Sequence, residues 1–176
     1  MNVQDDLRFI CSTIESSLRY AESKHAAFVA FNGLATFGGF GLLRNLNISS
    51  TGWVAHIMLS LAVGLLICAI LTSMYSFIPV IIREKKTDVA PASDNILFFE
   101  HVKHHSVESY EQLLCELYQV SPESITPLDR CVISQIIVNA YLTSRKFALF
   151  KRVAMLDIAA VAFVLIGIVL VLIRST

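Results

Sequence analysis

The polar residues best suited to chemistry gather at positions 100–108, where the chain reads Glu-His-Val-Lys-His-His-Ser-Val-Glu. On a helix, two pairs of residues four apart would each share a face: Glu100 with His104, and His101 with His105. Such pairs can ligate a divalent metal, but no third ligand follows at a recognisable spacing, so we predict no metal site. Lys103 could instead contact a phosphate or a ribose, and an ordinary helix surface would also account for the histidines.

A second set of residues is basic and flanks two apolar stretches of the chain: Arg19, Lys24, Arg145, Lys146, Lys151 and Arg152. Positive charges beside a membrane span often serve only to orient it. They could equally meet the phosphate of a ligand or of a lipid headgroup. The residues alone leave both interpretations open.

Signals for catalysis and for nucleic-acid binding are missing from the sequence. It contains no glycine-rich phosphate loop, no Gly-x-Ser-x-Gly and no His-Glu-x-x-His pattern, so we predict neither catalytic residues nor a cofactor. Lys and Arg together number 14, as do Asp and Glu, so the chain lacks the positive surplus typical of nucleic-acid binders.

The elements that must position these residues are predicted to be membrane-spanning helices. The chain is 55% hydrophobic and its mean hydropathy is +0.65. About 20 apolar residues cross a hydrocarbon core of about 30 Å, and three stretches qualify: 26–43, 53–82 and 153–173. Pro79 is expected to kink the second of them. We therefore predict an all-α membrane protein with three transmembrane helices, helical cytoplasmic extensions and a helical cap.

The first predicted span is set apart by small and polar residues: Asn32, Gly33, Gly38 and Gly39. Small residues permit close and alternative helix packings, so we predict that this span is the membrane gate. Asn32 is interpreted as an interhelical hydrogen-bonding group, with a pore-lining role as the alternative. In the third span, Asp157 is expected at headgroup depth beside Lys151 and Arg152.

The distribution of basic residues predicts the orientation in the membrane. Three precede the first span, one lies in 44–52, nine lie in 83–152 and one lies in 174–176. Cytoplasmic loops carry the excess of Lys and Arg. We therefore place residues 1–25 and 83–152 in the cytoplasm, and the loop 44–52 and the tail 174–176 outside it.

Two long helices are expected to join the cytoplasmic part to the membrane. Residues 1–25 carry an apolar stripe at helical spacing, and no Pro or Gly separates them from the first span. The run Thr126-Pro127-Leu128-Asp129 combines an N-cap residue, a proline at the first helical position and an acid at the third. Since no breaker follows before Gly167, one helix of about 45 residues is expected from Pro127 through the third span.

A cap is predicted between these long helices. Residues 96–105 and 107–118 are expected to be helical, with Ser106 as the N-cap of the second helix, and together they form the cap over residues 94–120. The cytoplasmic part is close to the lower size limit for a packed domain. We therefore expect additional burial between copies in a homo-oligomer.

Four motifs along the chain carry a family resemblance. They are Ala21-Glu22-Ser23-Lys24-His25-Ala26-Ala27 leading into Asn32-Gly33, then Asn95-Ile96-Leu97-Phe98-Phe99-Glu100-His101, then Tyr110, and last Gln135-Ile136 with Arg145-Lys146-Phe147. Together they resemble the Pycsar transmembrane effectors, from about Leu18 to the third span. The order of the spans and of the cytoplasmic insert agrees too. Related effectors fuse a separate cyclic-nucleotide-binding domain to the spans, which this chain lacks, so its cap would have to sense the nucleotide.

The resemblance implies an antiphage effector that is a multi-pass protein of the bacterial inner membrane, with its C-terminus in the periplasm. A partner pyrimidine nucleotide cyclase would make the activating ligand, cyclic CMP or cyclic UMP, during infection. The effector would then impair the membrane, and the infected cell would stop growing or die before phage matures. The residues carried over from the motifs, without individual roles, are Lys24, Asn32, Phe98, Phe99 and His101.

A docking hypothesis follows for the nucleotide. Its phosphate would meet some of the basic residues Arg19, Lys24, Lys103, Arg145 and Lys146, and its base would stack on Phe98, Phe99 or Tyr110. The alternative is a small membrane scaffold or adaptor, which would recruit a cytoplasmic partner through the N-terminal apolar stripe without any ligand gating.

Overall fold

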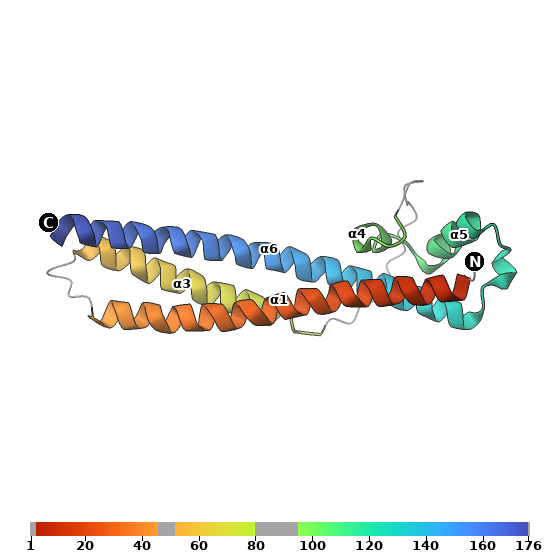
Figure 1. Cartoon of the computed structure of the whole chain (residues 1–176), viewed down its shortest axis with the longest axis horizontal. Helices are drawn as coiled ribbons and strands as arrows, with labels where there is room; N and C mark the ends of the chain where they lie inside the picture. Colours follow the sequence, from red (N-terminus) through yellow and green to blue (C-terminus); the bar gives the residue numbers. More distant parts are fainter. Residues whose placement is uncertain (1–2, 46–51, 80–94, 176) are drawn as a thin grey trace. The chain divides into compact units, whose positions relative to one another are not determined.

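The computed structural model describes residues 3–45, 52–79 and 95–175, and these residues form helices and connecting turns without a strand (Figure 1). The helices are α1 (Val3–Asn45), α3 (Trp53–Tyr75), α4 (Phe99–Val102), α5 (Val107–Tyr118), the short 3-10 helix η1 (Pro122–Ser124) and α6 (Pro127–Ser175). Three of them, α1, α3 and α6, are long and apolar enough to cross a membrane. The predicted fold class, an all-α membrane protein with three transmembrane helices, is confirmed.

The chain folds as two compact units. The head unit consists of Met1–Ala21 and Pro79–Phe147, and the span unit consists of Glu22–Ile78 and Ala148–Thr176. The helices α1 and α6 each supply one segment to both units. The expected continuity of both long helices is confirmed, because α1 runs unbroken over 43 residues and α6 over 49 residues.

The N-terminus of α6 has the predicted capping arrangement. The Thr126 hydroxyl accepts a hydrogen bond from the Asp129 backbone N–H at 3.2 Å, and the Asp129 carboxylate accepts one from the Thr126 backbone N–H at 2.9 Å. These bonds satisfy two N–H groups that an uncapped helix end would leave without a partner. Pro127 occupies the first helical position, where its missing N–H is harmless.

A single apolar core holds the head unit together. It includes Leu7, Ile10, Ile14, Val102, Tyr110, Leu114, Cys115, Ile125, Ile133, Ile136 and Ala140. The N-terminal stripe of α1 is therefore buried against α5 and α6 within the unit. This burial leaves no free stripe on α1 of the kind that the adaptor hypothesis requires.

The helix α5 begins where the sequence predicts. The Ser106 side chain accepts a hydrogen bond from the Ser109 N–H, as an N-cap does. The helix ends at Tyr118 and is capped by Gln119, which has a left-handed conformation with φ of 53° and whose N–H donates to the Cys115 carbonyl.

The helix expected at 96–105 is much shorter in the structure, where α4 covers only Phe99–Val102. The Asn95 side chain accepts a hydrogen bond from the Leu97 N–H at 2.9 Å, and His101 Nδ1 accepts one from the Asn95 N–H at 3.1 Å. Local side-chain bonds of this kind offer the backbone an alternative to helix. They account for the turn that precedes α4.

The second predicted span also ends earlier than expected. The helix α3 stops at Tyr75, and the residues up to Ile78 form turns, so Pro79 follows the helix instead of kinking it. Proline disfavours helical geometry in the residue before it, which favours an ending ahead of Pro79. The rest of the predicted span, 80–82, and most of the loop 44–52 lie outside the described residues.

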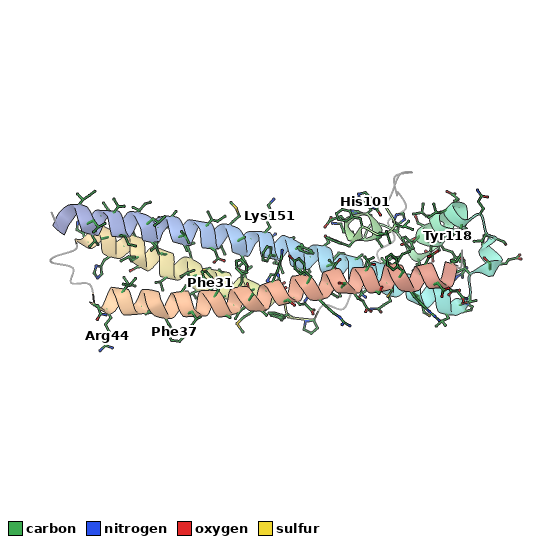
Figure 2. All side chains as sticks on the ribbon, in the orientation of Figure 1. Phe31, Phe37, Arg44, His101, Tyr118 and Lys151 are labelled. Atoms are coloured by element: carbon green, nitrogen blue, oxygen red, sulfur yellow. The ribbon has the colours of Figure 1, made fainter. Side chains whose placement is uncertain are left out.

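Within the span unit, α3 packs through one face, formed by Ala55, Leu59, Ala62, Val63, Leu66, Ala69 and Ser73. A Cβ atom added at Gly39 of α1 would lie 2.6 Å from Val63 Cγ2, and one at Gly167 of α6 would lie 3.2 Å from Leu59 Cγ. These two glycines thus allow α1 and α6 to approach α3 closely. Phe31 and Phe37, by contrast, are exposed on α1 (Figure 2).

Candidate ligand site and membrane gate

An aromatic cluster forms where α4 meets α6 in the head unit. The rings of Phe98 and Phe99 have centroids 5.0 Å apart, and Phe98 meets His101 edge-on at 5.3 Å. Phe99 stacks on Phe147 of α6 at 5.4 Å with an interplanar angle of 13°. Tyr20 of α1 approaches Phe147 at 6.4 Å. Three predicted site residues, Phe98, Phe99 and His101, are therefore brought together.

Two members of this aromatic environment, Phe147 and Tyr20, were not among the predicted ligand residues. Phe147 does belong to the Arg-Lys-Phe motif of the family resemblance, which was the available signal. Tyr20 carried no such signal, because its place beside Phe147 depends on how α1 and α6 pack in the head unit.

A charged group lies in the same region. Lys103 Nζ donates to the Glu100 carboxylate and, at 2.8 Å, to the Ser144 hydroxyl of α6. Burial by itself would raise the pKa of Glu100, but the hydrogen bonds from Lys103 and Ser144 outweigh it and lower that pKa. Lys103 is therefore a cation that is already paired with an acid in this conformation.

The imidazole of His101 is held in a defined orientation. Its Nδ1 accepts the Asn95 backbone N–H, so a neutral ring carries its proton on Nε2. Figure 2 labels this side chain beside α4. The bond links His101 to the turn that starts at Asn95, and it orients the ring against Phe98.

Tyr110 is a core residue in this conformation and does not offer its ring to a ligand. Its side chain is fully buried, and its hydroxyl donates to the Ile96 carbonyl at 2.9 Å. Burial raises the pKa of Tyr110, and the nearby Tyr118 raises it further by a smaller amount. The predicted stacking role of Tyr110 therefore has no support in this arrangement.

The histidine pairs considered for metal binding do not form. Because α4 ends at Val102, the positions four residues apart do not share a helical face. His105 is buried, its Nδ1 lies 3.1 Å from the Ser109 hydroxyl and its ring meets Tyr110 edge-on. Over residues 3–45, 52–79 and 95–175, no three His, Cys, Asp or Glu side chains converge.

The remaining predicted basic residues fall in different places. Arg19 is exposed on α1, and its Nη2 lies 4.0 Å from Glu15 Oε2. Arg145 and Lys146 belong to the head unit on α6, where Arg145 is half-buried and Lys146 is buried. Lys24 belongs to the span unit, with its Nζ 4.9 Å from the centroid of the Phe150 ring.

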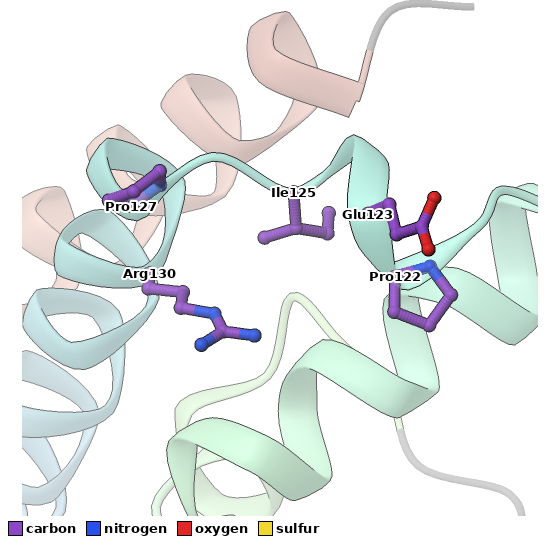
Figure 3. A pocket seen from close by; sticks show the side chains of 5 residues that line it. All are labelled: Pro122, Glu123, Ile125, Pro127 and Arg130. Atoms are coloured by element: carbon purple, nitrogen blue, oxygen red, sulfur yellow. The ribbon is translucent and has the colours of Figure 1, made fainter.

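A hollow in the head unit, of about 400 Å³, is lined by Pro122, Glu123, Ile125, Pro127 and Arg130 (Figure 3). Arg130 Nη2 donates to the buried Glu111 carboxylate at 2.8 Å. The Glu123 carboxylate also lines the hollow and would repel a phosphate. This hollow contains none of the predicted ligand residues, so we assign it no part in nucleotide binding.

The predicted gate residues divide into two groups. Asn32 is fully buried and lies beside Asp157 of α6, and a Cβ atom at Gly39 would meet Val63 of α3. A Cβ atom at Gly33 or Gly38 would meet nothing within 4 Å. Only Asn32 and Gly39 therefore belong to the packed interior of the span unit.

The expected environment of Asp157 is corrected by the structure. Asp157 is buried, and the side chain beside its carboxyl group is Asn32 instead of Lys151 or Arg152. Lys151 projects outward from α6 (Figure 2), and Arg152 is exposed as well. Asp157 follows Lys151 by six residues and Arg152 by five, and these spacings place it on a different face of α6, which is why sequence proximity misled the expectation.

Three membrane-length helices and a small helical head define the chain as an α-helical membrane protein. Residues 6–173 match the Pycsar effector protein domain, PycTM, and the chain belongs to this family. Membership supports a role as an effector of antiphage defence. Comparisons with curated proteins and with solved structures find no match.

Proposed function

We propose that this effector senses a cyclic pyrimidine nucleotide, cyclic CMP or cyclic UMP, and then impairs the bacterial inner membrane, which causes abortive infection. A partner pyrimidine nucleotide cyclase would supply the ligand. The observation that carries the proposal is the extent of the family match, which covers both the head unit and the span unit. One chain thus combines a polar head with the helices that would act on the membrane.

The aromatic cluster is the proposed docking place for the base. The Phe98 ring is 42% exposed, so one part of it is open to a ligand while Phe99 and His101 hold it from the other sides. Stacking of a nucleobase on an aromatic side chain contributes about 1–3 kcal/mol. Phe98 is therefore the residue on which binding should depend most.

Lys103 is the proposed partner of the phosphate. Its ion pair with Glu100 is partly exposed, and such pairs contribute little stability, about 0–1 kcal/mol. A cyclic phosphate carries one negative charge and can replace the Glu100 carboxylate at Lys103. Arg145 and Lys146 lie on the same part of α6 as Ser144, which also binds Lys103, and would add to the positive field.

The proposed signal runs through α6. Phe99 stacks on Phe147 and Lys103 bonds to Ser144, so a ligand that displaces the α4 residues changes the contacts of this helix. The same helix continues into the third apolar stretch. A ligand shifts a conformational equilibrium only by its differential affinity for the two states, and a few kcal/mol suffices.

Membrane impairment is proposed to involve several copies. The helices α1 and α6 approach one face of α3, and three helices alone do not surround an aqueous channel. The proposed orientation has the head in the cytoplasm, where the cyclase product would accumulate, and the C-terminus in the periplasm.

The test is dye release from liposomes that contain the full-length protein. Cyclic CMP, cyclic UMP, cyclic AMP, cyclic GMP and buffer are added in turn, and release with a cyclic pyrimidine nucleotide alone is expected. Phe98→Ala should raise the activating concentration on the order of tenfold or more. Leu97→Ala is the matched control, because Leu97 is the neighbouring residue and is 41% exposed. Correctly inserted protein that releases dye with none of the nucleotides would contradict the proposal.

A further inference from the structure

A hollow opens on the span unit between α1 and α6. It measures about 570 Å³, and ligand pockets in proteins measure about 300–1,000 Å³. Its lining residues are Ala27, Phe28 and Phe31 of α1 and Ala154, Asp157, Ile158 and Val161 of α6. All of them except Asp157 are apolar, and both carboxylate oxygen atoms of Asp157 are buried. The surface that a ligand would meet in this hollow is therefore apolar.

The hollow faces outward from the span unit. Three of its large apolar side chains, Phe31, Ile158 and Val161, are 61%, 65% and 53% exposed. Both α1 and α6 are long and apolar enough to cross a membrane, so hydrocarbon would surround this part of the protein. The ligands that can enter the hollow from that side are lipid acyl chains.

A cation lies close to the wall of the hollow. Phe28, which lines the hollow, meets Phe150 of α6 edge-on, with ring centroids 5.1 Å apart. Lys24 Nζ lies 4.9 Å from the centroid of the same Phe150 ring. The Phe150 ring thus connects the apolar wall to an ammonium group, which it attracts through its face.

A second lysine has the same relation to the hollow on α6. Lys151, which is exposed (Figure 2), precedes the lining residues Ala154 and Ile158 by three and seven residues. Lys24 likewise precedes Ala27 by three residues. These helical spacings place each lysine on the side of its helix that lines the hollow. Both lysines lie at the end where α1 and α6 enter the span unit.

The depth and the charge of this end fit an anionic headgroup. Lys24 and Lys151 each stand two residues ahead of an apolar stretch of membrane length, which is where headgroups lie. Residues 22–25 and 148–152 together contain three Lys or Arg residues and one Glu. Basic pockets between transmembrane helices bind anionic lipid headgroups. An apolar hollow with two lysines at one end therefore matches the two chemical parts of a phospholipid.

We propose that this hollow binds an anionic phospholipid, with one acyl chain against Phe28, Phe31 and Ile158 and the phosphate between Lys24 and Lys151. Burial of apolar surface holds the chain, and the two ammonium groups hold the phosphate. The lipid lies between the two helices that belong to both units of the protein. Its binding does not depend on the proposed nucleotide sensing.

The first test measures lipid retention by native mass spectrometry of the purified full-length protein in detergent, without nucleotide. Phosphatidylglycerol and phosphatidylcholine with identical acyl chains are titrated separately. Phosphatidylglycerol should bind more tightly, on the order of tenfold, and the double variant Lys24→Gln/Lys151→Gln should lose this preference. Arg152→Gln is the matched control, because it removes an adjacent exposed charge that lies on another face of α6. An unchanged preference in the double variant would overturn the proposal.

The second test concerns the hollow itself. Ala27→Leu places a larger side chain in the hollow and should weaken the binding of both lipids. Ala26→Leu is the matched control, because Ala26 is equally exposed on α1 but does not line the hollow. Equal lipid binding by the two variants would overturn the proposal. Since the two tests change different residues, one variant that fails to fold leaves the other test to decide.

Two further outcomes would assign the site to another occupant. If glycerol phosphate at the same concentration displaced phosphatidylglycerol, the lysines would bind a free phosphate and the hollow would play no part. If Ala27→Leu dissociated an oligomer in the mass spectrum and left phosphatidylglycerol bound, the hollow would be an interface between copies of the chain. Either outcome would overturn the proposed lipid site and leave the proposed function intact.

Discussion

The two units of this protein treat their buried polar groups differently. In the head unit, Tyr110 bonds to a backbone carbonyl, Lys103 bonds to Glu100 and Ser144, and Asp129 caps α6. Among the described residues of the head, Asp6 Oδ2 is an exception, because this buried atom has no hydrogen-bond partner.

In the span unit, several deeply buried polar atoms have no such partner among the described residues, including those of Asn32 and Asp157. Satisfied polar bonds favour one arrangement of a core, whereas unsatisfied ones raise its free energy relative to alternatives. The head is therefore built to keep a specific conformation, whereas the spans are built to accept another partner or another packing. Four predictions test this difference.

The largest effect is expected in the head core. Tyr110→Ala removes a fully buried ring and its bond to the Ile96 carbonyl, and should cost about 3–5 kcal/mol of unfolding free energy. Tyr110→Phe keeps the ring and should cost about 1 kcal/mol. Hydrogen exchange of the head residues measures both changes. Equal protection in the two variants would mean that the ring itself contributes little.

The next effect concerns the glycines of the first span. Gly39→Leu would force side-chain atoms into Val63 and should destabilise the α1–α3 contact by about 1–3 kcal/mol. Gly38→Leu is the matched control, because a Cβ atom there meets nothing within 4 Å. The two variants are compared by their thermal midpoints in detergent and by their nucleotide-activated dye release. A greater effect of Gly38→Leu on the midpoint would refute the packing described for this face.

A smaller effect is expected at the start of α6. Thr126→Ala removes the N-cap hydroxyl and should cost about 1 kcal/mol, seen as faster amide exchange in the first turn of the helix. Thr13→Ala is the control, since the Thr13 hydroxyl donates to the Phe9 carbonyl of its own helix. If the first turn of α6 also exchanged its amides faster in Thr13→Ala, the effect would be due to packing against α1 and not to loss of the N-cap.

The smallest effect is a pH dependence of the head unit. Burial opposes the ionised form of Asp129, but hydrogen bonds from Thr126 and Gln4 and the charge of Arg8 outweigh burial and lower its pKa. The contribution of Asp129 is therefore complete above its unfolded pKa of about 4 and is lost as the pH falls through the lower folded value. Head stability should be level from about pH 5 to pH 7 with respect to this group and fall below about pH 4. Asp129→Asn should weaken that fall.

Much of the architecture could be predicted from local sequence signals. The absence of breakers predicted the length of α1 and of α6, and the Thr-Pro-x-Asp run predicted where α6 begins. The Phe-Phe-x-His motif predicted residues that do meet in the head. Such signals succeed because capping, helix breaking and hydropathy act within a few residues along the chain.

The misplaced residues have a common cause. Tyr110 was expected at a ligand and lies in the core, and Asp157 was expected beside basic neighbours and lies beside Asn32. Gly38 and Gly39 are adjacent in sequence, yet a Cβ atom would meet a residue of α3 at Gly39 and nothing within 4 Å at Gly38. Each outcome depends on which face of a helix meets which neighbour.

Hydropathy, capping signals and motifs along the chain are enough to establish the helical class, the three membrane-length helices and the family to which the chain belongs. Packing of the folded chain is what brings Phe147 into the aromatic cluster and Asn32 and Asp157 into one interior. The physical reason is that hydropathy and capping depend on near neighbours along the chain. Contacts between helices depend instead on the rotation and register of residues far apart in sequence, such as Phe99 and Phe147 or Asn32 and Asp157.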